Sequence, residues 1–268
     1  MDHCAAQHRT RRRAKGTRMA APQGTVDKAI DVLFHLHRAG GPRGLTEVAT
    51  ALRLPKSSTH RLLASLRRRG LVEQDERGSY RPGTGLIALG LGAQQREPAV
   101  VAARPVLERA AREVGETFFL VVARGGELLV LDKAEGTGVL RAAPRVGSRV
   151  PVHATAVGKL YLAFAPDEVD FDPRRARAFT AATLTDARAL EAAVDEARRS
   201  GRALNRDEWV AGLSVLGAAV RAGGRLHACI ALAAPTRRLD ELGVAAMSAR
   251  VCDAAALVAA RLRGEVAP

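Results

Sequence analysis

A group of hydrogen-bond donors lies at the start of one expected helix, between Pro55 and Arg69. Pro55 can open this helix, because the first helical residue needs no backbone N–H. Leucines at helical spacing can pack inward and leave the donors on the other face. Donors at a helix start can reach base edges in the major groove, whereas arginines further along suit phosphates. The donors are Lys56, Ser57, Ser58, His60 and Arg61, followed by Arg67, Arg68 and Arg69. The same pattern also fits an ordinary amphipathic surface helix with a solvated basic face.

The neighbouring elements favour the DNA interpretation. Apolar residues at helical spacing predict a helix from Thr25 that ends at 40–42, and Thr46 is expected to cap a short helix over 47–52. After Gly70, residues 71–74 and 79–81 flank the turn 75–78 and predict a hairpin. Helix, short helix, helix and hairpin is the order of a winged helix-turn-helix. The candidate DNA-binding residues are therefore Thr46, Lys56, Ser57, Ser58, Thr59, His60, Arg61, Arg67 and Arg77.

A second constellation starts at Thr155, where an extended segment is expected to turn into a helix. The free N–H groups at a helix start attract anions. The small side chains of Ala154 and Ala156 would let a ligand approach the backbone. The alternative is a capped helix with a packed start and no ligand.

The remaining pattern predicts a mixed α/β domain. Expected helices cover 86–91, 99–114, a segment that starts at Thr155 and ends near 166, 187–200 and 239–262. Expected strands cover 118–122, 128–131, an extended pair within 139–152, 215–220 and 226–232. Adjacent hairpin strands argue for a largely antiparallel sheet. The fold class is α+β. The expected parts are a disordered basic tail over 1–24, a winged domain over 25–82, a connecting helix over 83–97 and a ligand-binding domain over 98–268.

Several runs together resemble the IclR family of transcriptional regulators. In the first domain they are 45–49, 54–63, 70–72 and 80–83. In the second they are 103–105, 115–117, 131–133, the long run from Gly147 to Lys159, and Glu208 with Gly212. The likeness covers about residues 25–262. It implies a GAF-like second domain, a palindromic double-stranded operator, a dimer or tetramer, and a small-molecule effector in the C-terminal domain. We expect the first helix and residues 86–91 to contribute to the dimer contact.

The sequence departs from family members that sense small organic acids. Where the resemblance places their Asp, Cys and two Ser, this chain has Asn205, Val215, Ala231 and Ala233. A pocket with so few polar groups favours a mid-sized, fairly apolar effector with one acidic or carbonyl group; a degenerate site without ligand is the alternative. The candidate effector-binding residues are Thr155, Ala156, Val157, Asn205, Leu213, Val215, Ala231 and Ala233.

Composition agrees with an intracellular DNA-binding protein. Of the 268 residues, 1–95 hold 17 of the 42 Lys and Arg but only 7 of the 28 Asp and Glu, so the excess of positive charge lies in the first third. A basic segment attached to a nearly balanced one suits a polyanion-binding module, although a basic surface can also serve solubility. The few, widely spaced cysteines fit a reducing cytoplasm. We see no apolar run of the kind that a secretory signal or a membrane span needs, so we expect a cytoplasmic protein without membrane contact. An alternative start at Met19 would remove most of the basic tail.

Other motifs carry no chemistry that the sequence supports. Residues 83–88 match a dinucleotide fingerprint but follow a polar hairpin, not a buried parallel strand. Residues 212–217 have the wrong spacing for a nucleophile elbow. Cys229 is expected in the core, and His153 is expected to be structural. We therefore expect no catalytic residues, no metal and no cofactor. An enzyme regulated by its N-terminal module, and a ligand-free architectural DNA binder, are the competing hypotheses.

Overall fold

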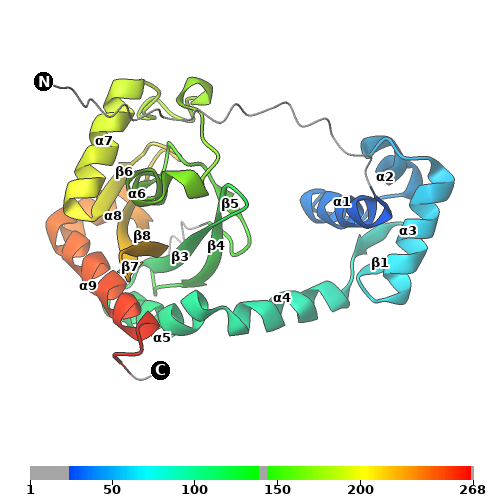
Figure 1. The fold of residues 1–268 in the computed structure, drawn as a ribbon, viewed down its shortest axis with the longest axis horizontal. Coiled ribbons are helices and arrows are strands. Elements are labelled where there is room, and N and C mark those ends of the chain that lie inside the picture. Colours follow the sequence, from blue (N-terminus) through cyan, green and yellow to red (C-terminus); the bar gives the residue numbers. More distant parts are fainter. Residues whose placement is uncertain (1–23, 139–143, 267–268) are drawn as a thin grey trace, which may run out of the picture. The chain divides into compact units, whose positions relative to one another are not determined.

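The computed structural model describes residues 24–138 and 144–266. The chain divides into two compact units, with the boundary between Leu91 and Gly92 (Figure 1).

The N-terminal unit is a small helical domain with a two-stranded hairpin. Its core is formed by apolar side chains from all three helices and both strands, among them Val32, Val48, Leu63, Val72 and Tyr80. The elements are α1 (Thr25–Arg38), α2 (Leu45–Ala51), α3 (Lys56–Arg68), β1 (Val72–Gln74) and β2 (Tyr80–Pro82), followed by α4 (Thr84–Arg96). This order confirms the predicted winged helix-turn-helix.

The start of α2 differs from the prediction. Gly44, not Thr46, is the N-cap residue, and the backbone N–H of Gly44 donates to the carboxylate of Glu47 at 2.7 Å. Glycine has no side chain that could cap the helix, so the side-chain contact at this end is the one from the N3 carboxylate back to the N-cap N–H. Thr46 lies in the first turn of α2, with its side chain exposed.

The C-terminal unit is built on one six-stranded sheet in which every neighbouring pair is antiparallel. This confirms the predicted antiparallel sheet. The strands are β3 (Thr117–Arg124), β4 (Glu127–Ala134), β5 (Arg149–Val150), β6 (Arg202–Arg206), β7 (Leu213–Ala222) and β8 (Arg225–Pro235), in the order β5-β4-β3-β8-β7-β6.

Helices cover both faces of this sheet, as Figure 1 shows. Alternate residues of β3 point to opposite faces. Phe118 and Leu120 pack with α5 and α9, whereas Phe119 and Val121 pack with α6 and α7. The four helices are α5 (Pro98–Val114), α9 (Val244–Leu262), α6 (Ala156–Phe164) and α7 (Ala187–Ser200). Two short 3₁₀ turns, Pro166–Glu168 and Pro173–Arg175, lie between α6 and α7.

Three predictions for this unit need correction. The single helix expected over 239–262 is two helices, α8 (Thr236–Leu242) and α9, which bend by 89° at Gly243. Strand β6 was not predicted. Of the extended pair expected within 139–152, the only strand among the residues that the structure describes is β5, and residues 139–143 lie outside them.

In the described part of the chain, no single helix is long and apolar enough to cross a membrane. Helices α8 and α9 pass such a test only when they are joined, and the sharp bend separates them.

Candidate functional site

Helix α3 divides into an exposed polar face and a buried apolar face. Lys56, Ser57, His60 and Arg61 are exposed in its first two turns, and Ser58 is half-buried. On the inner face Leu62, Leu63 and Leu66 enter the core of the N-terminal domain. From Lys56 to Arg69 the sequence contains no acidic residue. The exposed face of α3 is therefore a surface of positive charge and hydrogen-bond donors.

Thr59 does not belong to that surface. Its side chain is fully buried, and its hydroxyl donates to the carbonyl oxygen of Pro55 at 3.1 Å. Thr59 therefore stabilises the first turn of α3 and cannot reach DNA. The prediction of Thr59 as a DNA-binding residue was wrong.

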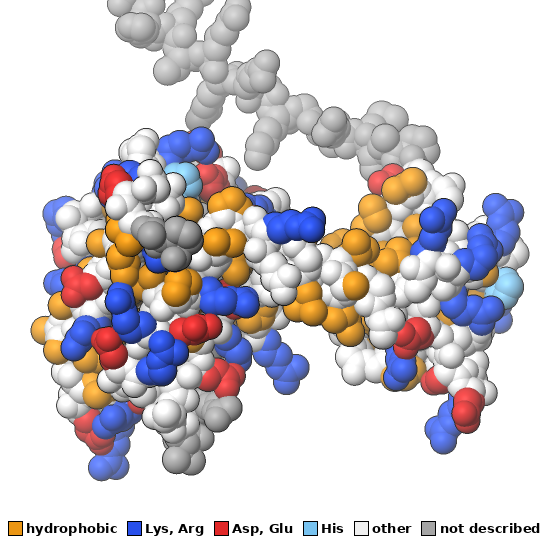
Figure 2. Space-filling model, turned by 90° about the horizontal axis from the view of Figure 1, so that it is seen from below, with side chains coloured by type: hydrophobic (Ala, Val, Ile, Leu, Met, Phe, Trp, Pro, Cys, Tyr) orange, Lys and Arg blue, Asp and Glu red, His pale blue; other side chains and the backbone are white. Residues whose placement is uncertain are grey.

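The hairpin of β1 and β2 supplies the basic residues beside α3. Arg77 is exposed in the turn, where the carboxylate of Asp75 accepts from the backbone N–H groups of Arg77 and Ser79. Arg67 donates to the side-chain carbonyl of Gln74 at 2.5 Å and so joins the end of α3 to β1. Figure 2 shows Lys and Arg side chains gathered on one side of the N-terminal domain. Arg67 thus lies in the last turn of α3, and Arg77 lies in the turn of the hairpin that follows it.

The second candidate site lies where α6 begins in the C-terminal domain. The hydroxyl of Thr155 caps α6: it accepts from the backbone N–H of Gly158 at 3.1 Å and donates to the carbonyl oxygen of Pro151 at 2.6 Å. Gly158 lies so close to the preceding segment that an added Cβ would be 1.7 Å from the carbonyl oxygen of Val152. The amides of Ala156 and Val157 lie in the same first turn, where a helix offers them no acceptor of its own.

A narrow, mostly apolar pocket opens beside this helix start. Its free volume is about 20 Å³, room for about one water molecule, so a larger ligand needs the surrounding side chains to move. Five predicted residues line it: Thr155, Val157, Asn205, Leu213 and Val215. The others that line it are Phe119, Pro144, Val150, Trp209 and Val210.

Ala156, Ala231 and Ala233 do not line the pocket but are buried in the layer between α6 and the sheet. Cross-strand register accounts for the two alanines of β8. Ala231 is paired with Phe119, and Ala233 with Val215. Paired residues share a face of the sheet, so the larger side chain of each pair reaches the pocket.

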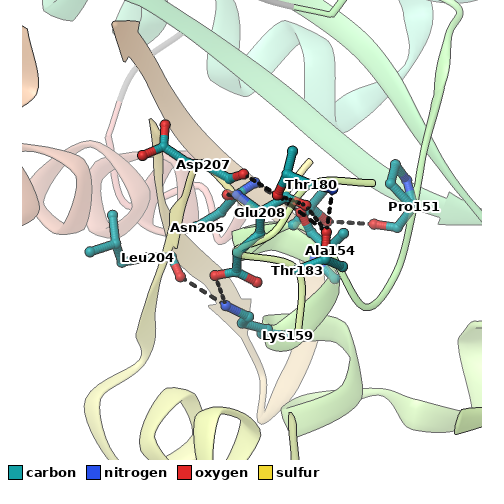
Figure 3. A network of polar contacts seen from close by, with 11 residues as sticks. Pro151, Ala154, Lys159, Thr180, Thr183, Leu204, Asn205, Asp207 and Glu208 are labelled. Atoms are coloured by element: carbon teal, nitrogen blue, oxygen red, sulfur yellow. Dashed lines mark hydrogen bonds and ion pairs between the residues drawn. The ribbon is translucent and has the colours of Figure 1, made fainter. Parts of the chain in front are cut away.

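The amide of Asn205 is already engaged within the protein (Figure 3). Its nitrogen donates to the carbonyl oxygen of Ala154, and its oxygen accepts from the backbone N–H of Glu208, each at 2.9 Å. One N–H of the amide is left over for a ligand, because the group carries two. The predicted role of Asn205 is thus reduced to at most one donor.

A buried ion pair continues this polar network (Figure 3). The ammonium group of Lys159 lies 2.5 Å from the carboxylate of Glu208 and donates to the carbonyl oxygen of Leu204 at 3.0 Å. The hydroxyl of Thr183 donates to the backbone carbonyl oxygen of Glu208 at 2.6 Å. Sequence reasoning noted Lys159 and Glu208 as family motif residues but did not pair them.

His153 and Cys229 have structural surroundings. The ring of His153 stacks between Phe171 and Phe179, with centroid distances of 5.5 and 5.6 Å, and its Nε2 lies 2.9 Å from the carbonyl oxygen of Arg177. Burial raises the pKa of the Cys229 thiol well above its ordinary value, which keeps it protonated. Across residues 24–138 and 144–266, no cluster of His, Cys, Asp or Glu could hold a metal ion.

Comparison with known proteins gives the family of both domains. Residues 25–76 match the model of the IclR helix-turn-helix domain, and residues 93–260 match that of the bacterial transcriptional regulator IclR C-terminal domain. The chain is 33% identical to the HTH-type transcriptional regulator BhcR of Paracoccus denitrificans over 235 residues, which cover 86% of this chain and 84% of BhcR. It is 30% identical to the HTH-type transcriptional repressor AllR of Salmonella typhimurium, with 81% of each chain covered.

The fold also matches solved structures. An IclR homologue from Microbacterium hydrocarbonoxydans, complexed with 4-hydroxybenzoate, aligns with a TM-score of 0.79 over 90% of this chain and 100% of its own. At 22% identity, this likeness shows the fold alone.

Proposed function

This chain belongs to the IclR family of bacterial transcriptional regulators, and we propose that α3 reads its operator while the pocket beside α6 binds the effector. The observation that supports this most directly is the exposed donor face at the start of α3, next to the hairpin with Arg77. A recognition helix needs that arrangement, because its first residues meet base edges.

The exposed residues divide by the groups that they can reach. We propose that Lys56, Ser57, His60 and Arg61, with a smaller part for Ser58, face the bases. Thr46, Arg67 and Arg77 suit the phosphates, since Arg67 has donors left beside its bond to Gln74 and Arg77 lies at the tip of the hairpin. Selection of binding sites from a random duplex library tests this. A single enriched sequence supports it, and retention of duplexes without any enrichment contradicts it.

We further propose that the protein acts as at least a dimer. Val26, Ile30 and Phe34 are exposed on α1, and Ile87, Leu89 and Leu91 on α4, which has no buried residue. Apolar side chains on a helix with no buried side of its own are suited to a second copy of the chain. Two copies related by a twofold axis would read the two halves of a palindromic operator.

The lining of the pocket favours an aromatic or similarly apolar acid as effector. Phe119, Trp209 and Val215 offer apolar contact, whereas Thr155 and Asn205 have few donors left. Burying apolar ligand surface gains roughly 25 cal/mol per Å², while a buried polar group without a partner costs roughly 2–7 kcal/mol. The homologue of the same fold from Microbacterium hydrocarbonoxydans is complexed with 4-hydroxybenzoate, a compound of this class that serves as the first probe.

Thermal-shift measurements test the effector class, because a ligand that binds only the folded state raises the melting temperature. We expect 4-hydroxybenzoate or a compound of similar size and polarity to stabilise the protein and to change operator affinity. Stabilisation by glyoxylate or pyruvate alone would contradict the proposed class. A response to no compound, with operator binding intact, would favour a DNA binder without effector.

We propose no catalytic step for this chain. Of the polar side chains that line the pocket, Thr155 caps a helix and Asn205 holds a loop, and the nearby Lys159 and Glu208 form an ion pair with each other. Since the operator lies in the bacterial cytoplasm, we place the protein there.

A further inference from the structure

The buried ion pair of Lys159 and Glu208 lies behind the pocket and does not line it. Only 3% of Lys159 and 6% of Glu208 is exposed. Lys159 comes from the second turn of α6, the helix whose start carries Thr155 and Val157. Glu208 comes from the loop 207–212 after β6, which also carries Trp209 and Val210. The pair, shown in Figure 3, therefore joins two segments that each contribute residues to the lining of the pocket.

The stability of the fold gives little reason for such a pair. Removing two charges from water costs several kcal/mol for each ion, and apolar side chains of similar volume often stabilise a core as well or better. The second carboxylate oxygen of Glu208 is buried with no hydrogen-bond partner. An oxygen left unsatisfied adds to the cost. The pair is thus better explained by what it positions than by what it contributes to stability.

Glu208 is held at its amide, its carbonyl oxygen and its carboxylate. Its backbone N–H donates to Asn205, its backbone carbonyl oxygen accepts from Thr183, and its carboxylate binds Lys159. Trp209 follows directly in the chain, so the direction of its side chain depends on how Glu208 is fixed. Lys159 also donates to the carbonyl oxygen of Leu204, in the middle of β6 and directly before Asn205.

We propose that Lys159 and Glu208 are positioning residues that hold loop 207–212 against α6, so that Trp209 forms a wall of the pocket. That this pocket takes an effector rests on the proposed function above. The placement of Trp209 does not rest on it, because it follows from contacts within the chain.

Trp209 reports on its own position, since it is the one tryptophan in the sequence. The test replaces the pair by apolar residues, Lys159→Met with Glu208→Leu, and compares it with Lys159→Met alone. We expect the single variant to melt well below the wild type, because it leaves a buried charge without a partner. The double variant should melt within about 4 °C of the wild type. In the double variant, the emission of Trp209 should shift to the red and its quenching by acrylamide should increase.

A second ion pair provides the matched control. Arg104 and Asp132 join α5 to β4 through two hydrogen bonds, of 2.9 and 3.1 Å, and Asp132 is as buried as Glu208. Arg104→Met with Asp132→Leu should leave the emission and quenching of Trp209 at the wild-type values. If loss of the Arg104–Asp132 pair, in which only Asp132 is buried, changed Trp209 equally, the effect would be general loosening and the proposal would be wrong.

Wild-type emission and quenching in a folded Lys159→Met, Glu208→Leu variant would also overturn the proposal. Should that variant not fold, Lys159→Met with Glu208→Gln carries the same test, because it removes both charges and nearly keeps the volume of each side chain. Increased quenching in this variant supports the proposal, and wild-type quenching contradicts it. The fluorescence test uses no ligand. If Trp209 does not respond, the effector proposal still stands, and if the protein binds no effector, the fluorescence test is still valid.

Discussion

Neighbouring residues of α3 have opposite roles because the helix has one buried side. Thr59 is fully buried and bonds to Pro55, whereas His60 and Arg61 are exposed. A polar residue in α3 is therefore available to DNA only if its side chain points away from the core. In the pocket, polar residue type is likewise no proof of ligand contact. Thr155 and Asn205 are polar, but most of their hydrogen bonds are formed within the protein.

Arg61→Ala and Lys56→Ala should each weaken operator binding. A side chain that reads a base contributes roughly 1–3 kcal/mol, and its loss relaxes specificity at that base, whereas the loss of a phosphate contact lowers the salt dependence of binding. The variant with the smaller change in salt slope identifies the base-reading residue. Titrations of a labelled operator at several salt concentrations measure both the affinity and its salt dependence.

Arg188→Ala is the control. It removes an exposed charge from α7 and should bind like the wild type. Wild-type affinity in the Lys56, Arg61 double variant would refute the assignment of α3.

Val215→Thr should weaken binding of an apolar effector with little change in fold. Threonine keeps the shape of valine but adds a hydroxyl, and a buried hydroxyl without a partner costs roughly 1–3 kcal/mol. Calorimetry with the compound that most raises the melting temperature measures the change. Val220→Thr is the matched control, because Val220 is buried on the same strand but packs against the other face of the sheet. Equal loss of affinity in both variants would show that the effect does not come from the pocket.

At the scale of elements, local patterns predicted most helices and the hairpins. The period of 3.6 located α1, α3, α5 and α7, since each has one buried stripe. The pocket could not be predicted as well, because its walls depend on pairings across the sheet. Phe119 displaces Ala231 from the pocket through their register, and nothing local to either residue shows this. Strand β6 was missed because only its pairing with β7, not an apolar run, makes Arg202–Arg206 extended.

Gly243→Ala should destabilise the C-terminal domain. Gly243 has a φ of +82° at the bend between α8 and α9, a conformation that costs alanine of order 1 kcal/mol or more. Urea unfolding measures the loss. Gly90→Ala is the opposite control: Gly90 lies within α4 with open space around its Cα, so alanine there should favour the helix by about 1 kcal/mol. A wild-type urea midpoint in Gly243→Ala would mean that the bend does not need glycine.

The junction of the hairpin and α4 should lose stability in acid. The carboxylate of Glu73 accepts from the backbone N–H of Thr84 at 3.0 Å and binds Arg81, and these contacts hold its pKa below the ordinary 4.5. Because the pKa is lower in the folded than in the unfolded state, the ionised Glu73 stabilises the folded protein above pH 4.5. This contribution disappears as the pH falls through the folded-state pKa, where Glu73 becomes protonated. Glu73→Gln should therefore show a smaller loss of stability between neutral and acid pH than the wild type. An identical pH dependence in both proteins would contradict this role.

For the whole molecule, oligomerisation should decide whether DNA is read specifically. One winged domain contacts too few bases to identify an operator, so two must bind together. Exposed apolar side chains on α1 and α4 mark where a second copy would pack, with Leu89 64% and Ile87 60% exposed.

Ile87→Glu with Leu91→Glu should leave each domain folded, because neither side chain enters a core, while like charges would repel a partner helix. Light scattering at micromolar concentration should give at least twice the mass of one chain for the wild type. The variant should have half the mass that is measured for the wild type. Specific operator binding should then be lost although weak binding to any duplex remains. A wild-type protein that is monomeric in solution and still binds one sequence specifically would refute the dimer, and a variant that keeps the wild-type mass would place the interface elsewhere.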